Sequence, residues 1–256
     1  MSILEAHDLG IRFGGLWALR GVDLSLAEGE VRGLIGPNGS GKSTFFHLVV
    51  GRHTPTTGEI IYRGKPLARL SPSQRARIGI AIKFQITSLF EGLTVAENAQ
   101  MGVVGRQTSI RRLARDKLPV STDPSRPEES SAEILELVGL SDRRNDLAGS
   151  LSHGEKQWLE IGMALATNPD LLLLDEPTSG MGREETRKTA ELVLRLKGSR
   201  TILVIEHDMA FVRQVADSIT VLSKGEVLTE GTYESVKDDQ RVIEAYLGKG
   251  RVRDAS

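Results

Sequence analysis

Eight residues near the N-terminus have the types and spacing that bind phosphate. The segment Gly36–Ser43 reads GPNGSGKS and matches the pattern G-x-x-x-x-G-K-[ST] in full. It follows an apolar segment, 30–35, that is typical of a strand, and precedes an apolar segment, 44–50, that is typical of a helix. The glycines let successive backbone N–H groups point at one centre, and the helix N-terminus adds positive potential. The motif therefore predicts a loop that binds a nucleoside triphosphate.

Two side chains of this loop have expected roles of their own. Lys42 can reach the β- and γ-phosphates, and the Ser43 hydroxyl can ligate Mg²⁺. The residues expected to contact the nucleotide are Gly36, Pro37, Asn38, Gly39, Ser40, Gly41, Lys42, Ser43 and Thr44. A glycine-rich turn with a chance Lys-Ser pair is the alternative, and the strand–loop–helix setting argues against it.

An acidic pair, Asp175 and Glu176, ends the apolar run LLLLDE. Ligands of an open parallel sheet bind beyond the carboxyl ends of its strands. One carboxylate there can hold a metal ion, and its neighbour can orient a water. Two solvated acids at a strand end are the alternative. Together with the phosphate loop, the pair predicts an NTP-hydrolysing P-loop protein, which leaves kinases, GTPases, helicases and transport ATPases open.

The elements that position these residues follow from the hydrophobic pattern. Segments 3–13 and 22–27 alternate apolar and polar residues and predict strands. After residue 151, helices are expected at 155–167, 184–197, 209–216 and 239–247, and strands at 171–175, 201–206, 218–223 and 227–230. Helices that alternate with apolar strands predict an α/β fold with a mostly parallel sheet covered on both faces.

The middle of the chain differs in composition. Residues 94–101 are expected to form a helix, and the polar, proline-containing stretch 105–131 an insertion or mobile loop. Ser130 and Ser131 are expected to cap a helix that runs to Val138, with Gly139 at its C-terminal end.

Composition excludes several classes of protein. The 256 residues include 33 Lys and Arg, 34 Asp and Glu, and no Cys, for a net charge of −1. The absence of Cys excludes disulfides, Cys-ligated metals and thiol nucleophiles. The balanced charge argues against a nucleic-acid binder. No apolar stretch approaches the ~18–20 residues that span a bilayer. We therefore expect a cytoplasmic protein that reaches a membrane only through a partner.

Residues outside the phosphate loop and the acidic pair resemble one family. The segment Leu151–Glu155, LSHGE, resembles the LSGGQ signature of the ATP-binding cassette (ABC) family and lies one helix before Asp175. Chemically it is a second anion site, because a Ser hydroxyl and the N–H groups of a small-residue turn open a helix. Gln85, His207 and Phe13 resemble the family's Q-loop glutamine, switch histidine and adenine-stacking aromatic, and Trp17 is the rival aromatic.

The resemblance implies an ATP hydrolase that uses ATP and Mg²⁺. Glu176 would polarise the attacking water, and His207 would help to hold the γ-phosphate. The implied catalytic residues are Glu176, His207, Gln85 and Lys42, and the implied metal ligands are Ser43, Gln85 and Asp175. Phe13 would stack on adenine. Ser152 and Gly154 would contact the nucleotide of a second subunit, so that a head-to-tail dimer encloses ATP.

The resemblance also implies the organisation of the chain. It predicts one ABC ATPase domain over residues 1–250, built on a P-loop NTPase core with an N-terminal antiparallel β subdomain and an inserted helical subdomain. Residues 1–84 and 168–250 would form the core with the β subdomain. Residues 85–167 would form the helical subdomain, which carries the signature and the insertion 105–131.

Three residues depart from the family pattern. His153 replaces the usual second-position Gly of the signature, and Glu155 replaces the usual Gln. Gly182 stands where most members carry an Asp at the end of the D-loop, the segment after the acidic pair, and it supplies no carboxylate.

A finer resemblance concerns transport. IRFGGLWAL, IKFQITSLFEGLTVAEN, VIEHDMAFV and RVIEAYLG resemble ATPase subunits of importers for branched-chain amino acids, urea and short amides. LSHGEKQWLEIGM is more similar to the urea type. The resemblance implies an importer subunit on the inner face of the cell membrane. The ATPase of a lipid or lipopolysaccharide exporter and a regulatory ABC ATPase are the alternatives.

The importer resemblance also implies partners. They are an integral-membrane permease, a paralogous ABC ATPase subunit in a heterodimer, with a homodimer as the alternative, and, indirectly, a periplasmic or extracellular solute-binding protein. No nucleic acid is expected. The stretch 105–131 resembles the extra loop of the longer of two paralogous ATPases. Its basic residues would be a solvated face or would contact the permease or anionic headgroups; they are Arg106, Arg111, Arg112, Arg115 and Lys117.

Overall fold

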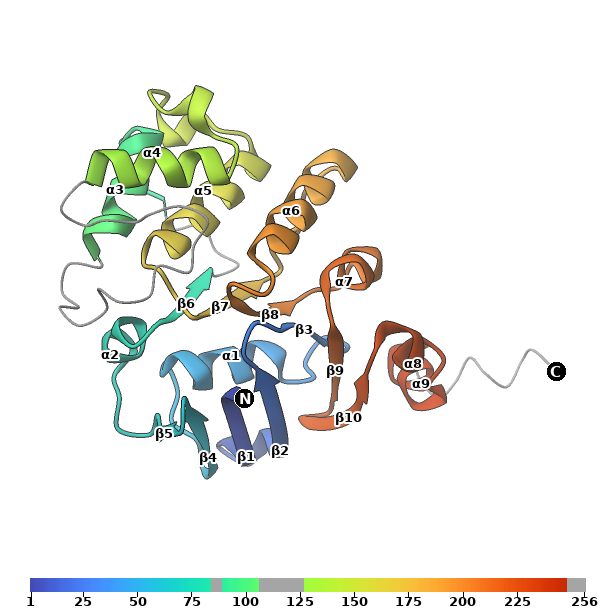
Figure 1. The fold of residues 1–256 in the computed structure, drawn as a ribbon. Coiled ribbons are helices and arrows are strands. Elements are labelled where there is room, and N and C mark those ends of the chain that lie inside the picture. Colours follow the sequence, from blue (N-terminus) through green and yellow to red (C-terminus); the bar gives the residue numbers. More distant parts are fainter. Residues whose placement is uncertain (84–88, 106–126, 248–256) are drawn as a thin grey trace. The chain divides into compact units, whose positions relative to one another are not determined.

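The computed structural model describes residues 1–83, 89–105 and 127–247 (Figure 1). The chain forms two compact units, Met1–Pro72 with Leu203–Ser256, and Ser73–Ile202. These bounds differ from those of the expected core and helical subdomain, whose assignment stays a prediction. Among the helices in the described residues, none is long and apolar enough to cross a membrane.

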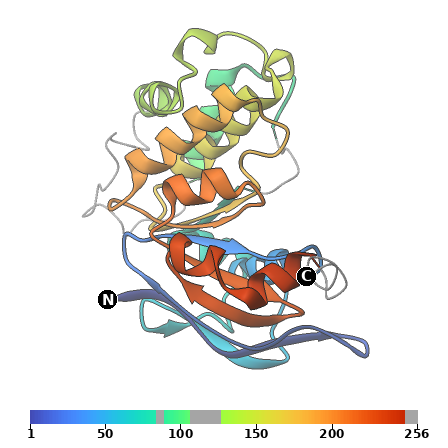
Figure 2. The same cartoon turned by 90° about the vertical axis from the view of Figure 1, so that its right-hand side faces the viewer.

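An antiparallel sheet forms the N-terminal part of the first unit. Its strands follow the order β2-β1-β4-β5 and span Leu16–Ala27, Ser2–Phe13, Thr57–Tyr62 and Lys65–Pro66. Figure 2 shows β1 and β2 as long neighbouring strands. In β2 every second residue from Val22 to Leu26 is buried, as the alternating pattern predicts. The expected N-terminal β region is therefore confirmed.

Parallel pairing begins with β3 (Val31–Ile35), which lies beside β9 (Ser218–Ser223) in the same direction. Strand β10 (Glu226–Gly231) pairs antiparallel with β9. The described helices of this unit are α1 (Lys42–Val50), α7 (Met209–Val215), α8 (Tyr233–Lys237) and α9 (Gln240–Leu247). One core cluster joins three of these helices to β3 and β9 through Ile35, Val212, Ile219, Val221, Val236 and Val242.

The second unit pairs β6 (Ile80–Lys83) in parallel with β7 (Leu171–Asp175). Its helices are α3 (Val95–Gly105), α4 (Pro127–Leu137), α5 (His153–Ala166) and α6 (Arg183–Leu196). Trp158 of α5 is buried, and its Nε1 donates to the Thr189 hydroxyl of α6 at 2.9 Å. Helix α2 (Pro72–Arg77) and strand β8 (Thr201–Ile205) contain the two divisions between units.

Helix α4 corrects one expectation. It begins at Pro127 and does not start at a Ser130/Ser131 cap, and both serines are buried inside the helix. The Ser131 hydroxyl donates to the Glu128 backbone oxygen at 2.9 Å instead of capping. Proline suits the first helical position because the N–H it lacks would be unsatisfied there. The expected C-terminal end is confirmed, since Gly139 has φ +74° and donates its N–H to the Glu136 oxygen.

Candidate nucleotide site

The phosphate loop connects β3 to α1 and leaves the first turn of α1 open. In the described part of the chain, no side chain caps this helix, and its first turn carries no acid. Its N-cap residue is Gly41, with φ +107°. A Cβ at this position would lie 2.5 Å from Leu19 Cδ2 and 2.7 Å from the Ala18 oxygen, so only glycine fits. The open N–H groups form a favourable anion site.

Lys42 folds back over the loop that precedes it. Its side chain is buried, and Nζ donates to the backbone oxygens of Gly36 at 2.7 Å and Pro37 at 3.1 Å. Ser43 is exposed on the same first turn. A cation and a hydroxyl therefore stand beside the open helix end, as the motif predicts.

Phe13 ends β1 with its side chain 48 % exposed. The His53 ring meets it edge-on, with centroids 5.2 Å apart. Trp17, the rival aromatic, is partly buried and has the Arg12 guanidinium 5.9 Å from its ring centroid. The geometry thus favours Phe13 as the aromatic that offers a face to a base.

His207 follows β8 with an exposed side chain. Its backbone N–H donates to the Glu206 carboxylate at 3.0 Å, and Asp208 caps α7 by accepting the N–H groups of Ala210 and Phe211. These bonds fix the backbone around His207. Gln85 lies outside the described residues, and so do the five basic residues of the insertion.

The sequence pattern indicates no functional role for Tyr246 of α9. The backbone N–H of Gly36, the first residue of the phosphate loop, hydrogen-bonds its hydroxyl oxygen. Burial raises the pKa of this phenol, and the Gly36 bond offsets the rise only in part. An aromatic residue on an amphipathic helix usually indicates core packing, so the sequence carried no signal for this contact.

The acidic pair lies at the carboxyl end of β7 in the second unit. Asp175 is buried and Glu176 partly buried. Glu176 has φ +47°, a conformation that a residue with a side chain adopts only when its surroundings impose it. The Ser179 N–H donates to the backbone oxygen of Glu176 at 3.2 Å and closes a turn that follows the acidic pair.

The signature segment opens α5 with a closed capping box. The Ser152 hydroxyl accepts the Glu155 N–H at 3.2 Å, and the Glu155 carboxylate accepts the Ser152 N–H at 2.8 Å. Arg143 Nε lies 3.2 Å from the same carboxylate. Burial raises the pKa of Glu155, but the bonds from Ser152 and Arg143 outweigh it and hold this pKa below its ordinary value. Gly154 is buried in the first turn of the helix.

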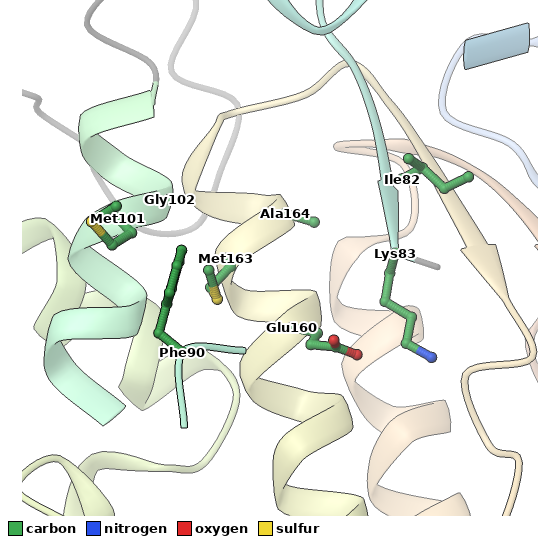
Figure 3. A pocket seen from close by; sticks show the side chains of 8 residues that line it. All are labelled: Ile82, Lys83, Phe90, Met101, Gly102, Glu160, Met163 and Ala164. Carbon is green, nitrogen blue, oxygen red and sulfur yellow. The ribbon is translucent and has the colours of Figure 1, made fainter. Parts of the chain in front are cut away.

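A pocket of about 340 Å³ lies within the second unit (Figure 3). Phe90 and Met101, 50 % and 48 % exposed, line it together with Ile82, Lys83, Gly102, Glu160, Met163 and Ala164. Lys83 and Glu160 are themselves buried. Half-exposed large apolar side chains in a pocket are typical of a surface that receives a partner.

Comparison with known proteins agrees with this geometry. Residues 19–179 match the family model described as ABC transporter, and residues 226–252 match the model of the branched-chain amino acid ATP-binding cassette transporter. The chain is 38 % identical over 254 residues to the high-affinity branched-chain amino acid transport ATP-binding protein LivG of Salmonella typhimurium, covering 96 % of this chain and 98 % of LivG.

Solved structures are similar over almost the whole chain. The ADP conformation of an ABC transporter's ATP-binding cassette has a TM-score of 0.84 at 31 % identity and covers 97 % of this chain and 100 % of the other. A dimeric ATP-binding cassette in a post-hydrolysis state, bound to ADP and Pi, has a TM-score of 0.75 at 26 % identity and covers 90 % and 98 %.

Proposed function

Since this chain belongs to the ABC transporter family and is one of its ATPases, we propose that it is the ATP-hydrolysing subunit of an importer for branched-chain amino acids. The likeness to LivG extends over nearly the full length of both proteins and supports this solute class. The match of residues 226–252 supports it independently, because this segment lies outside the general cassette model.

The open N-terminus of α1 carries the proposal. Phosphoryl transfer needs mainly positioning and charge stabilisation, and the loop supplies backbone N–H groups together with Lys42. When ATP binds, Lys42 would exchange the oxygens of Gly36 and Pro37 for phosphate oxygens. Phe13 would stack on adenine, and His207 would hold the γ-phosphate.

Hydrolysis would depend on Glu176. We assign it the polarisation of the attacking water, with Gln85 as a second contact to that water or to the metal. The Ser43 hydroxyl and the Asp175 carboxylate are oxygen donors of the kind that Mg²⁺ prefers, so the residues fit this ion. Bound Mg²⁺ would neutralise charge on the phosphates.

The signature would act on the nucleotide of a second subunit. Ser152 and Gly154 open α5 with small residues, as a close approach to phosphate requires. The similar dimeric cassette with ADP and Pi supports a dimer for this chain as well. We propose a heterodimer with a paralogous ATPase. A complex that contains two copies of this chain and no paralogue would contradict the heterodimer.

Transport requires a permease, which we place against the pocket of Phe90 and Met101. The pocket includes Lys83, the residue directly before the segment that contains Gln85. A permease element seated there would thus touch the start of that segment. Phe90→Glu, which places a negative charge in the pocket, should weaken permease co-purification. Leu147→Glu should not, because Leu147 is also half-exposed but lies outside the pocket.

Two experiments test the proposed function. The chain co-purified with its permease and solute-binding protein and reconstituted in vesicles should drive ATP-dependent uptake of radiolabelled leucine, isoleucine or valine. Uptake of urea in place of these amino acids would contradict the proposed solute.

A second experiment tests hydrolysis. Glu176→Gln should retain ATP binding and lose turnover by about 10³-fold or more. Near-normal turnover would remove Glu176 from the mechanism.

A further inference from the structure

The imidazole of His153 joins the signature turn to the turn behind the acidic pair. Its Nε2 lies 2.9 Å from the backbone oxygen of Ser179, a residue 26 positions further along the chain. A carbonyl oxygen only accepts hydrogen bonds, so this nitrogen carries the proton and donates it. The residue that departs from the usual signature glycine therefore has a defined partner.

Gly180 provides the space for this imidazole. It has φ +76°, and a Cβ built on it would lie 3.1 Å from His153 Nε2 and 3.2 Å from Cδ2. A side chain at position 180 would press against the ring that binds Ser179. His153 and Gly180 therefore fit each other sterically.

The contact continues to Glu176 through the backbone. His153 donates to the backbone oxygen of Ser179, and the Ser179 N–H donates to the backbone oxygen of Glu176 at 3.2 Å. At the other end of this turn, the Gly182 N–H donates to the Glu185 carboxylate at 2.9 Å. That carboxylate packs against Gly154, where a Cβ would meet it at 2.3 Å. The signature thus contacts the middle of the turn 176–182 directly and its last residue through the Glu185 carboxylate.

We propose that His153 is a positioning residue for ATP hydrolysis, which holds the turn 176–182 of its own subunit and, through Ser179, the backbone of Glu176. The inference rests on the role proposed above for Glu176. The positive φ of Glu176 needs such support, because the conformation is unfavourable by itself. A small displacement of a group that orients a reactant lowers the rate steeply.

Three substitutions of His153 separate this role from others. Asparagine, glutamine and leucine replace the ring, but only glutamine places an amide N–H near the position of Nε2. We expect His153→Asn and His153→Leu to lower kcat for ATP about tenfold with KM unchanged, the equivalent of one hydrogen bond of about 1.4 kcal/mol. His153→Gln should retain most of kcat. The side chain is exposed, so all three variants should keep the melting temperature of the parent.

Other outcomes would overturn the proposal. Parental kcat in His153→Asn and His153→Leu would show that the Ser179 bond does not serve hydrolysis. A raised KM with unchanged kcat would make His153 a nucleotide contact. If the kcat of His153→Gln is no higher than that of His153→Asn, the hydrogen bond donated by Nε2 is not the cause of the effect.

A double-mutant cycle tests the fit with Gly180. Gly180→Ala should lower kcat in the parent, and it should cost clearly less in a His153→Ala background, where no ring is displaced. Equal costs in both backgrounds would contradict the coupling. Glu176→Gln, measured alongside, keeps the two proposals apart. If Glu176→Gln loses turnover while the His153 variants keep the parental kcat, only the positioning role of His153 is overturned. If Glu176→Gln keeps normal turnover, the role of Glu176 itself is overturned.

Discussion

Among the described helices, α1 and α5 begin at segments that resemble phosphate-binding motifs, and their first turns differ in how their backbone N–H groups are satisfied. Helix α1 begins after Gly41, with no side-chain cap among the described residues and no acid in its first turn. Helix α5 begins after Ser152 with both arms of a capping box closed and Glu155 in its first turn. Backbone N–H groups are open at α1, whereas at α5 the protein's own side chains already satisfy two of them.

This difference predicts an order of events. We expect the loop before α1 to bind a triphosphate by itself, with the Lys42 cation beside it. A phosphate that reaches α5 must compete with the Glu155 carboxylate, which favours the helix but repels an anion. Nucleotide should therefore bind at α1 first and reach α5 only when a second subunit presents it.

Removal of the cation at α1 should have the largest effect. Lys42→Ala should lower turnover by about 10²–10³-fold, because the developing phosphate charge loses a preorganised donor. Phosphate release measures this loss of turnover, and binding of a fluorescent ATP analogue measures how far nucleotide affinity changes with it. Lys188→Ala removes an exposed lysine from α6 and serves as the matched control. Turnover close to that of the parent would show that α1 does not mark the hydrolytic site.

Substitution of Gly41, the glycine before α1, should have the next largest effect. Gly41→Ala should destabilise the fold by about 2–4 kcal/mol, since overpacking against Leu19 adds to the unfavourable φ. Gly139→Ala is the control, because its φ is also positive but nothing lies within 4 Å of a Cβ there. It should cost about 1–2 kcal/mol. Urea unfolding compares the two, and equal costs would contradict the close packing at Gly41.

The charge at α5 should have a smaller effect of opposite sign. Glu155→Gln keeps an acceptor for the Ser152 N–H and removes the negative charge, so ATP-dependent dimerisation should strengthen about two- to fivefold. Sedimentation in a Glu176→Gln background, where hydrolysis is slow, measures it. Glu184→Gln, in the first turn of α6, is the control. Unchanged dimerisation would show that α5 receives no phosphate.

Lowering the pH should slightly reduce the stability that the first turn of α5 contributes, and it should not affect the first turn of α1, which carries no acid. The pKa of Glu155 lies below its ordinary value of 4.5 in the folded chain. Its carboxylate therefore stabilises the fold above about pH 4.5, and this contribution is lost as pH falls through the lowered pKa. Melting curves of the parent should lose more stability than those of Glu155→Gln between pH 5 and pH 3, each compared with its own value at pH 7. Parallel losses would contradict this.

Contiguous motifs were predictable, and contacts between distant segments were not. The phosphate loop is one run of eight residues whose spacing determines its geometry, and β7 was predicted with its observed bounds. The bond between His153, at the start of α5, and Ser179 joins two segments that only the fold brings together, although His153 is itself a departure from the family pattern. The Ser130/Ser131 cap failed because Pro127 competes for the same helix start.

The hairpin turn between β9 and β10 has a consequence for protein engineering. Lys224 and Gly225 both have positive φ and form a two-residue turn, which is ordinarily a convenient place to insert a tag. Here the Gly225 N–H donates to the Ser40 oxygen of the phosphate loop at 3.0 Å, and its own oxygen accepts the Arg20 N–H at 2.8 Å. We therefore expect a fluorophore on Lys224 to respond when nucleotide binds the loop, and a domain inserted at this turn to disturb the loop.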